Sequence, residues 1–259
     1  MKKLYIVSTG AGGTSYLTRE ALDAIEDSEV IVGYTKYIKE LKLEFKDKEL
    51  FNSGMTKEIA RCDQAIEIAR TGKTTTIISN GDVNVFGMAT LVVELMDEKD
   101  LWDEIDIVSV PGVSSVFAAA SKVGAPLSQD FAVISLSDRL TDPAMINKRI
   151  FNALEADFVV AIYNPKSKKR IKPYQDFLDI LNKFDEKIIT IAQNVGREEK
   201  EHIAITTSTD LITQGLAHED VGMSTLIIVG NSNSRLTKNG KILTPRGYLK
   251  KYEATGDLK

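Results

Sequence analysis

The sequence predicts an α/β fold that is divided into two domains. Short runs rich in β-branched residues alternate with longer amphipathic stretches over the 259 residues, which is typical of βαβ units. A chain of this length accommodates two domains of ordinary size. The break at Gly124-Ala125-Pro126 places the boundary, so we expect domains at 1–123 and 124–250 and a disordered tail at 251–259.

The first half alternates regularly, which favours parallel pairing. We expect strands at Leu4–Thr9, Val30–Val32, Thr74–Ser79 and Ile105–Val110. The expected helices are Thr18–Asp27, Lys57–Arg70, Met88–Met96 and Ser114–Val123. In the helix expected at Lys57–Arg70, apolar residues at helical spacing predict a buried face made of Ile59, Cys62, Ile66 and Ala69. Pro111 and Gly112 end the last strand of this half, because proline fixes φ and glycine permits a reversal.

The second half is less regular. The expected strands are Phe131–Ser135, Phe158–Tyr163, Ile188–Gln193, His202–Thr207 and Ser224–Val229, and the expected helices are Ala144–Leu154, Tyr174–Phe184 and Thr209–Leu216. The strands at 188–193 and 202–207 follow each other with no long helix between them. This succession predicts a mixed sheet with some antiparallel pairing.

Composition excludes several classes of protein. The apolar fraction of 43% and charged fraction of 27% are those of a soluble enzyme, and a net charge of −4 argues against general nucleic-acid binding. Cys62 is the single cysteine, which excludes an internal disulfide and suits a reducing compartment. We expect a cytoplasmic protein without a membrane span, because the sequence has no long apolar run and no signal-peptide pattern. No metal site is expected, since no ligand spacing surrounds the cysteine or the histidines.

The turn at Gly81-Asp82 is the most informative motif, because it separates a predicted strand from a predicted helix. Its carboxylate can receive donors from a ligand or cap the helix that follows. A second glycine-rich loop, Thr9–Ser15, follows the first strand, where main-chain amides favour anions. A dinucleotide site would need a third glycine in place of Ser15 and an acid in place of Gly33-Tyr34, so we expect neither nicotinamide nor flavin.

Similar polar turns occur near other strand ends, and we expect them to surround one cleft between the two halves. They are Ser53–Glu58, Val110–Ser115, Ser135–Asp138, Ile162–Ser167, Gln193–Arg197, Val229–Ser232 and Thr244–Tyr248. Taken singly, each is typical of an ordinary turn or cap. A basic patch at 166–172 is either a solvated loop or a clamp for a polyanion.

With these motifs in order from Leu4 to Tyr248, the sequence resembles the tetrapyrrole methylase family, and within it the C17-methyltransferases that act on precorrin-3B or cobalt-factor III in cobalamin biosynthesis. The general marks are the first glycine loop, Gly81-Asp82 and Pro111-Gly112-Val113. The more specific marks are Gly54-Met55-Thr56, Gly124–Leu127, Asp130–Asp138, Tyr163-Asn164-Pro165, Gly230-Asn231-Ser232 and Thr244–Tyr248.

The resemblance implies a class III methylase fold, with two α/β domains and a ligand cleft between them. It also implies S-adenosylmethionine as methyl donor, a homodimer, no protein-bound metal, and an acidic tetrapyrrole acceptor that either carries cobalt or is metal-free. The family enzymes of this type methylate C17 and are associated with contraction of the macrocycle. Whether contraction takes place on this protein is left open.

Two motifs depart from the family pattern. The usual Gly-x-Gly-Pro-Gly loop is Ser8-Thr9-Gly10-Ala11-Gly12 in this chain, and the usual Gly-Asp-Pro is Gly81-Asp82-Val83. Val83 restores a backbone donor and loosens φ, where proline would fix it. Phe86 keeps an aromatic wall where the family has tyrosine. We expect donor binding to survive, with altered affinity or macrocycle preference.

The resemblance also assigns residues to the ligands. The donor is expected to contact Gly81, Asp82, Val85, Phe86, Ser114 and Ser115 from the first domain, and Tyr163, Asn164 and Asn194 from the second. The acceptor is expected to meet Gly10, Gly12, Arg139, Lys166, Lys168 and Arg197, the last four through its acetate and propionate groups. Surface charge is the simpler explanation for those four.

No general acid or base stands out, and Asp138, Ser137 and His202 are weak candidates. Methyl transfer from a sulfonium requires alignment more than acid–base groups. Two other functions stay open. One is methylation of another tetrapyrrole carbon, and the other is non-catalytic binding of the donor or of a corrinoid.

Overall fold

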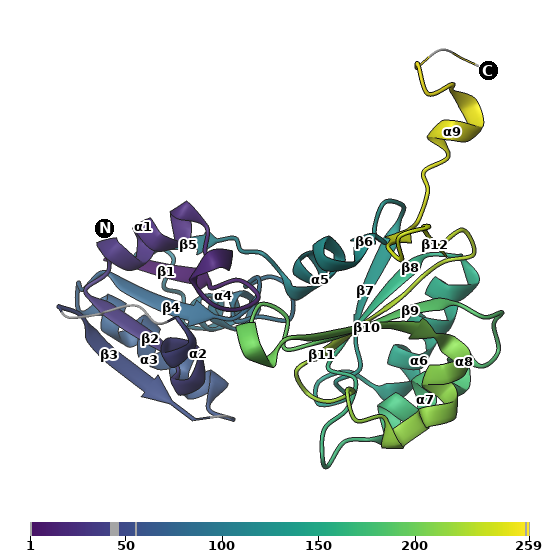
Figure 1. Ribbon diagram of the computed structural model, residues 1–259. Coiled ribbons are helices and arrows are strands. Elements are labelled where there is room, and N and C mark those ends of the chain that lie inside the picture. Colours follow the sequence, from purple (N-terminus) through teal and green to yellow (C-terminus); the bar gives the residue numbers. More distant parts are fainter. Residues whose placement is uncertain (1, 42–46, 55, 257, 259) are drawn as a thin grey trace. The chain divides into compact units, whose positions relative to one another are not determined.

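The computed structural model describes residues 2–41, 47–54, 56–256 and 258, and these form two compact units (Figure 1). The first unit holds the residues up to 115 together with 196–199, and the second holds 116–195 and the residues from 200 onward. The predicted boundary at 123/124 lies at the other end of helix α5 (Ser115–Val123) from this division. Disorder of 251–259 stays a prediction, since residues 257 and 259 lie outside the described residues.

The first unit contains a parallel sheet in the order β3-β2-β4-β1-β5. Its strands are β1 (Lys2–Ser8), β2 (Val30–Tyr34), β3 (Glu49–Ser53), β4 (Thr75–Ser79) and β5 (Ile105–Val110). Neighbouring strands of this sheet pair in parallel, which confirms the prediction for this half. The carboxyl ends of all five strands therefore lie at one edge of the sheet.

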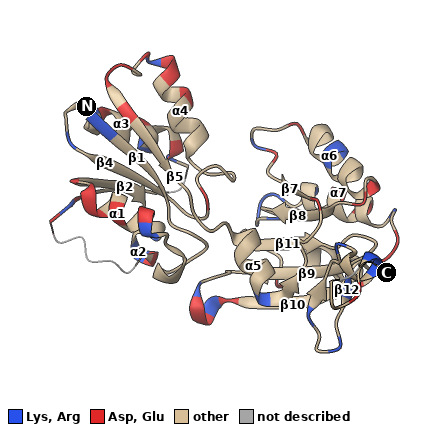
Figure 2. Ribbon diagram, turned by 90° about the horizontal axis from the view of Figure 1, so that it is seen from above, with Lys and Arg blue, Asp and Glu red and all other residues tan. Residues whose placement is uncertain are grey.

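Helices cover both faces of this sheet (Figure 2). Helices α3 (Glu58–Arg70) and α4 (Ala89–Glu98) pack on one face with Leu4 and Ile6, whereas α1 (Arg19–Asp27) packs on the other with Val7. Short helix α2 (Thr35–Glu40) follows β2. Acidic residues, whose ribbon is red in Figure 2, recur on α1, α3 and α4.

The predicted buried face of α3 is wrong at its start. Ile59 is 66% exposed, whereas Cys62, Ile66 and Ala69 are buried as expected. Arg61 is the buried residue of the first turns, because its guanidinium donates to Ser53 Oγ (3.0 Å) and to the Gly54 carbonyl (2.8 Å). The first turn of α3 thus directs Arg61 inward and leaves Ile59 facing solvent.

The second unit contains a mixed sheet in the order β10-β9-β11-β8-β7, as predicted. Its strands are β7 (Phe131–Ser135), β8 (Val159–Tyr163), β9 (Ile188–Gln193), β10 (His202–Thr207) and β11 (Thr225–Val229). Strands β7 and β8 are parallel, and β11 is antiparallel to both β8 and β9. The carboxyl ends of β7, β8 and β9 thus share one edge, and β11 ends at the opposite edge.

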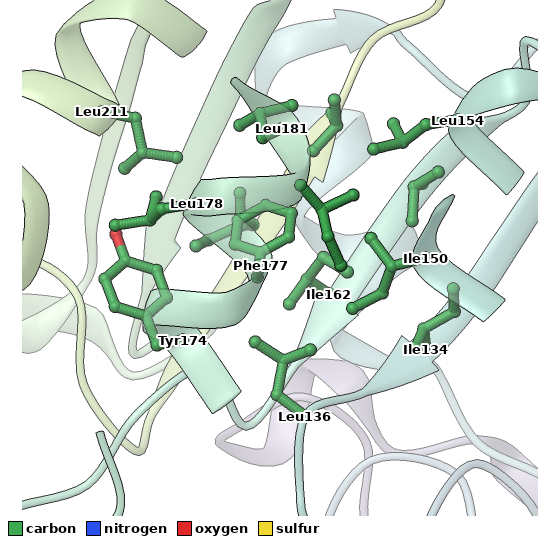
Figure 3. Close-up of a cluster of buried hydrophobic side chains, with 14 of the residues drawn as sticks. Ile134, Leu136, Ile150, Leu154, Ile162, Tyr174, Phe177, Leu178, Leu181 and Leu211 are labelled. Carbon is green, nitrogen blue, oxygen red and sulfur yellow. The ribbon is translucent and has the colours of Figure 1, made fainter. Parts of the chain in front are cut away.

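The core of the second unit lies between this sheet and its helices α6 (Pro143–Glu155), α7 (Lys172–Leu181) and α8 (Ser208–Gln214). Figure 3 shows Tyr174 and Phe177 of α7 among aliphatic side chains of the sheet and the other helices. Both aromatic side chains are fully buried. Burial of such rings contributes much of a core's stabilisation, so α7 anchors this layer.

The remaining elements are short. A small sheet joins β6 (Gly124–Ala125), β13 (Ile242–Leu243) and β12 (Arg235–Leu236), and helix α9 (Tyr248–Lys251) follows. Single 3-10 turns occur at Thr14–Tyr16, Glu198–Lys200 and Gly215–Ala217. Within the described ranges, no helix combines the length and the apolar character that crossing a bilayer requires.

Candidate active site

The turns after β1, β4 and β5 meet at the carboxyl edge of the first sheet. Gly10 and Gly81 form an isolated antiparallel bridge, in which Gly81 N–H donates to the Gly10 carbonyl (2.7 Å) and Gly10 N–H donates to the Gly81 carbonyl (3.1 Å). Both glycines have left-handed φ, +74° each. A side chain at Gly81 would meet no atom within 4 Å, so its outer side is open. This geometry suits a main-chain surface that a ligand can approach.

Asp82 is fixed by backbone donors on both carboxylate oxygens. Its Oδ1 accepts from Asn84 N–H (2.8 Å) and its Oδ2 accepts from Gly112 N–H (2.9 Å). The second bond joins the turn after β4 to the turn after β5. Asp82 therefore fixes the turn and does not cap the following helix α4, whose N-cap residue is Met88, so the capping interpretation was wrong. The remaining lone pairs of its half-buried carboxylate can still accept from a ligand.

The residues after Asp82 form a tight turn with an exposed aromatic side chain. Val85 N–H donates to the Asp82 carbonyl (3.1 Å), which closes a β-turn. Phe86 follows with φ of +56° and is 54% exposed. A non-glycine residue in this region is uncommon, and such strain is typical of functional turns. Phe86 thus presents more than half of its surface to solvent.

Ser114 and Ser115 lie where β5 passes into α5. Ser114 is 2% exposed and Ser115 is half-buried. In the second unit, the Tyr163 hydroxyl accepts from Val116 N–H (3.0 Å) in the first turn of the same helix. The sequence analysis predicts that Tyr163 contacts the methyl donor. In the structure its hydroxyl also caps the first turn of α5.

Two asparagines follow the parallel strands of the second unit. Asn164 comes after β8 and Asn194 after β9, and each has φ of +51°, the left-handed conformation that asparagine tolerates. Asn164 Nδ2 donates to Ser135 Oγ (3.0 Å) at the end of β7. Tyr163, Asn164 and Asn194 therefore share the carboxyl edge of the second sheet.

Arg170 holds this edge together, and the sequence analysis did not assign it a role beyond the basic patch. Its guanidinium donates to the Leu136 carbonyl (2.6 Å) and the Asn164 carbonyl (2.7 Å), and burial lowers its pKa. Asp138 Oδ1 lies 3.9 Å from its Nε. The sequence of 165–173 alternates charged residues with proline, and this pattern does not indicate that Arg170 would bind two main-chain carbonyls.

The weak catalytic candidates have ordinary contacts. Ser137 N–H donates to Ser135 Oγ (3.2 Å), and Asp138 faces Arg170. His202 begins β10, pairs with Gln193 across the sheet, and lies 3.5 Å from Asp220. All three are near the carboxyl edge, and these contacts do not single out one of them as the general acid or base.

The four predicted acceptor cations fall into two groups. Lys166 is engaged, because its ammonium donates to the carbonyls of Leu216 (2.6 Å) and His218 (3.0 Å), and burial lowers its pKa. Arg197 is engaged too, since its Nε donates to Glu40 Oε1 (3.1 Å). By contrast, Arg139 and Lys168 are exposed.

Gly10 and Gly12 are buried, and their lack of a side chain is explained by backbone packing. A Cβ on Gly10 would lie 2.4 Å from the Tyr16 carbonyl oxygen, and one on Gly12 would lie 2.8 Å from the Gly196 carbonyl oxygen. Contact of these two residues with an acceptor stays a prediction.

Several motifs expected around one cleft lie at the opposite edge of the second sheet. Gly230 N–H donates to the Ile188 carbonyl (2.8 Å), at the start of β9. Asn231 Nδ2 donates to Gln129 Oε1 (2.8 Å), and Gln129 Nε2 donates to the Pro245 carbonyl (2.7 Å). The motifs at 124–127, 230–232 and 244–245 thus build a structural hydrogen-bonded corner. The expectation was wrong for 230–232, because β11 is antiparallel to β8 and β9 and therefore ends at their amino-terminal edge. It was wrong for 244–245 too, because the Pro245 carbonyl accepts from Gln129 at that same edge.

The motif at 54–56 is only partly described, since Met55 lies outside the described residues. Within the described ranges, no group of three or more histidine, cysteine or acidic side chains is arranged to hold a metal ion.

Comparison with known proteins identifies related sequences and structures. Residues 3–212 match the family described as Tetrapyrrole (Corrin/Porphyrin) Methylases. A protein of Methanocaldococcus jannaschii, named a probable cobalt-factor III C(17)-methyltransferase, is 40% identical over 96% of this chain and 99% of its own length. A Salmonella typhimurium protein with the same name is 39% identical over 95% and 99%. The crystal structure of the methyltransferase CobJ superposes with a TM-score of 0.86 at 29% identity, covering 95% of this chain and all of that one.

Proposed function

The chain belongs to the tetrapyrrole methylase family, and from this premise we propose that it transfers a methyl group from S-adenosylmethionine to C17 of a tetrapyrrole of the cobalt-factor III type. The observation that carries this proposal is identity of about two residues in five, over nearly the full length of both chains, to relatives that bear that name. The proposal extends to the associated contraction of the macrocycle in cobalamin biosynthesis.

The donor site that we propose centres on the Gly81–Asp82 turn. Its open face at Gly81, the fixed carboxylate of Asp82 and the exposed ring of Phe86 supply a polar main-chain surface beside an aromatic one. This combination suits a nucleoside attached to a charged amino acid. Contacts of the donor with Val85, Ser114, Ser115, Tyr163, Asn164 and Asn194 stay predictions.

The residues present fit a positioning enzyme. The donor supplies an activated methyl group, so the protein has to hold the two reactants in line. Turns tied by backbone bonds, such as Gly10–Gly81 and Asp82–Gly112, are rigid and lose little entropy when a ligand binds. The ordinary contacts of Ser137, Asp138 and His202 agree with a reaction that needs little acid–base assistance.

For the acceptor, we propose that Arg139 and Lys168 meet its carboxylate groups, because both cations are exposed on loops next to the carboxyl edge of the second sheet. Arginine and lysine suit such groups. Roles for Lys166, Arg197, Gly10 and Gly12 stay predictions. We further propose that the natural acceptor carries cobalt, since both closely similar relatives are named for cobalt-factor III. A homodimer and a cytoplasmic location belong to the proposal as well, and light scattering and fractionation test them.

Binding and turnover measurements test the function. Calorimetry with S-adenosylhomocysteine is expected to give one site per chain, and incubation with S-adenosylmethionine and cobalt-factor III is expected to give a product heavier by one methyl group in mass spectrometry. The metal-free acceptor, run in parallel, is expected to react more slowly. Absence of binding heat would exclude a methylase, and binding without transfer to any tetrapyrrole would favour a non-catalytic homologue. Methylation at another carbon would assign the chain to a sister activity.

An Asp82→Ala variant tests the location of the site. It loses two backbone hydrogen bonds at the turn, so we expect donor affinity to fall at least about tenfold. Asp157→Ala is a matched control, because Asp157 also accepts two bonds, from the amide (2.8 Å) and hydroxyl (2.6 Å) of Ser232, at the other edge of the second sheet. Equal affinity of Asp82→Ala and wild type would show that the donor binds elsewhere.

A further inference from the structure

A buried hydrogen bond joins the two motifs that depart from the family pattern. Val83 N–H donates to Ser8 Oγ at 2.9 Å, and neither residue has any solvent exposure. Ser8 is the last residue of β1, and Val83 comes directly after the Gly81-Asp82 turn that follows β4. The bond therefore ties the far side of this turn to the neighbouring strand.

The two departures are chemically complementary. The pattern that the resemblance implies has glycine at position 8 and proline at position 83. Glycine offers no side-chain acceptor, and proline has no N–H to donate. A chain with valine at position 83 but glycine at position 8 would bury the Val83 N–H without an acceptor, which is destabilising. Ser8 supplies the acceptor for this buried donor.

The bond completes the fixation of three consecutive residues. Gly81 is bridged to Gly10, Asp82 Oδ2 accepts from Gly112 N–H, and Val83 is bound to Ser8. Each of residues 81, 82 and 83 is thus tied to the end of β1 or β5. Removal of any one bond leaves the turn held on fewer sides.

We infer that Ser8 is a positioning residue for the methyl donor. Its hydroxyl orients the Gly81–Asp82 turn through Val83 N–H, a task that a proline ring performs by fixing φ. This inference rests on the proposed function, because it assumes that the turn contacts the donor. The backbone can accept proline at this place, since Val83 is the second residue of the β-turn closed by Val85 N–H and the Asp82 carbonyl, where proline is favoured.

A cycle of Ser8→Gly, Val83→Pro and the double variant tests the inference, with S-adenosylhomocysteine affinity by calorimetry, KM for the donor and kcat as readouts. Ser8→Gly leaves Val83 N–H unpaired, and we expect affinity about tenfold weaker with KM raised more than kcat is lowered. Val83→Pro places a ring carbon against Ser8 Oγ and is expected to weaken binding similarly. The double variant removes donor, acceptor and clash together, and we expect affinity within about threefold of wild type.

The control is Ser28→Ala. Ser28 is also buried in the first unit, and its hydroxyl donates to the Ala24 carbonyl (2.7 Å) next to the opposite edge of the sheet. We expect this variant to lower the melting temperature without changing donor affinity, which separates positioning from general stability.

The outcomes for the inference and for the proposed function are distinct. Wild-type protein that binds no S-adenosylhomocysteine contradicts the function itself. Wild-type protein that binds it, combined with unchanged affinity of Ser8→Gly or with a double variant no better than the weaker single variant, overturns the role of Ser8. If Ser8→Gly does not fold, the double variant is compared with wild type directly, and a loss of more than about tenfold has the same meaning.

Discussion

We expect Gly112→Ala to lower the activity of the donor site strongly while the protein stays folded. A Cβ on Gly112 would lie 2.4 Å from Ser8 Cβ and 2.7 Å from the Gly81 carbonyl oxygen. Ordinary contacts of this kind begin near 3.4 Å, so the neighbours must separate by about 1 Å. Because Ser8 is held inside β1, we expect the displacement to fall on the Gly81–Asp82 turn and on its bond from Gly112 N–H.

The magnitude follows from two terms. Overpacking of this kind costs about 1–3 kcal/mol of stability, or several degrees in melting temperature for a chain of this length. A misplacement of about 1 Å at a positioning site lowers the rate roughly a hundredfold. We therefore expect kcat/KM with cobalt-factor III to fall by about two orders of magnitude while the protein stays folded at room temperature.

Steady-state kinetics and thermal melting are the assays, with Gly222→Ala as the control. No atom lies within 4 Å of a Cβ built on Gly222, so this variant is expected to change stability by less than about 0.5 kcal/mol and to leave kcat/KM unchanged. A folded Gly112→Ala protein whose kcat/KM stays within threefold of wild type would refute the assignment of this edge to catalysis.

Three further predictions concern stability and reactivity. Tyr174→Phe should leave the free energy of unfolding in urea denaturation unchanged or raise it by up to about 1 kcal/mol, because the buried Tyr174 hydroxyl has no hydrogen-bond partner among the described residues. Tyr163→Phe should lower the free energy of unfolding, because Val116 N–H loses its acceptor. A large loss of stability in Tyr174→Phe would contradict this reasoning. Cys62 is buried and its pKa is raised to about 12 by desolvation, so a thiol reagent at pH 8 should label it only after unfolding, and rapid labelling of native protein would disagree. Burial lowers the pKa of His218, so between that lowered pKa and about pH 6.5 the unfolded chain binds more protons than the native one. Over this window stability should fall with decreasing pH by at most about 1.4 kcal/mol per pH unit. His218→Asn should reduce this slope, and a slope equal to that of wild type would be the contrary result.

Sequence patterns predicted the strands that are buried on both faces and the longer helices, because hydrophobic runs and helical spacing are strong there. They did not predict β3, a strand at the edge of the first sheet whose residues are mostly exposed and carry no apolar alternation. They also missed the two-residue strands β6, β12 and β13, which exist only through pairing between distant segments. Non-local pairing leaves no local signal.

The site was predicted unevenly for similar reasons. Turns after parallel strands, such as the one at Gly81–Asp82, were placed at a common edge because parallel strands share one direction. The motif at 230–232 was misplaced, since only the pairing of β11 reveals its direction. Ser8 and Arg170 were missed because their roles depend on partners far along the chain, Val83 and Leu136, that periodicity does not identify.

The segment at 196–199 has a consequence for how the protein is made. Gly196 packs against Gly12, and Arg197 pairs with Glu40, so the N-terminal unit takes its last piece from a stretch translated long after residue 115. During synthesis on the ribosome, the N-terminal unit cannot complete its structure until residues 196–199, which follow β9, have been translated. A gene fragment that stops at residue 115 would encode an incomplete body, with the backbone of its glycine loop uncovered.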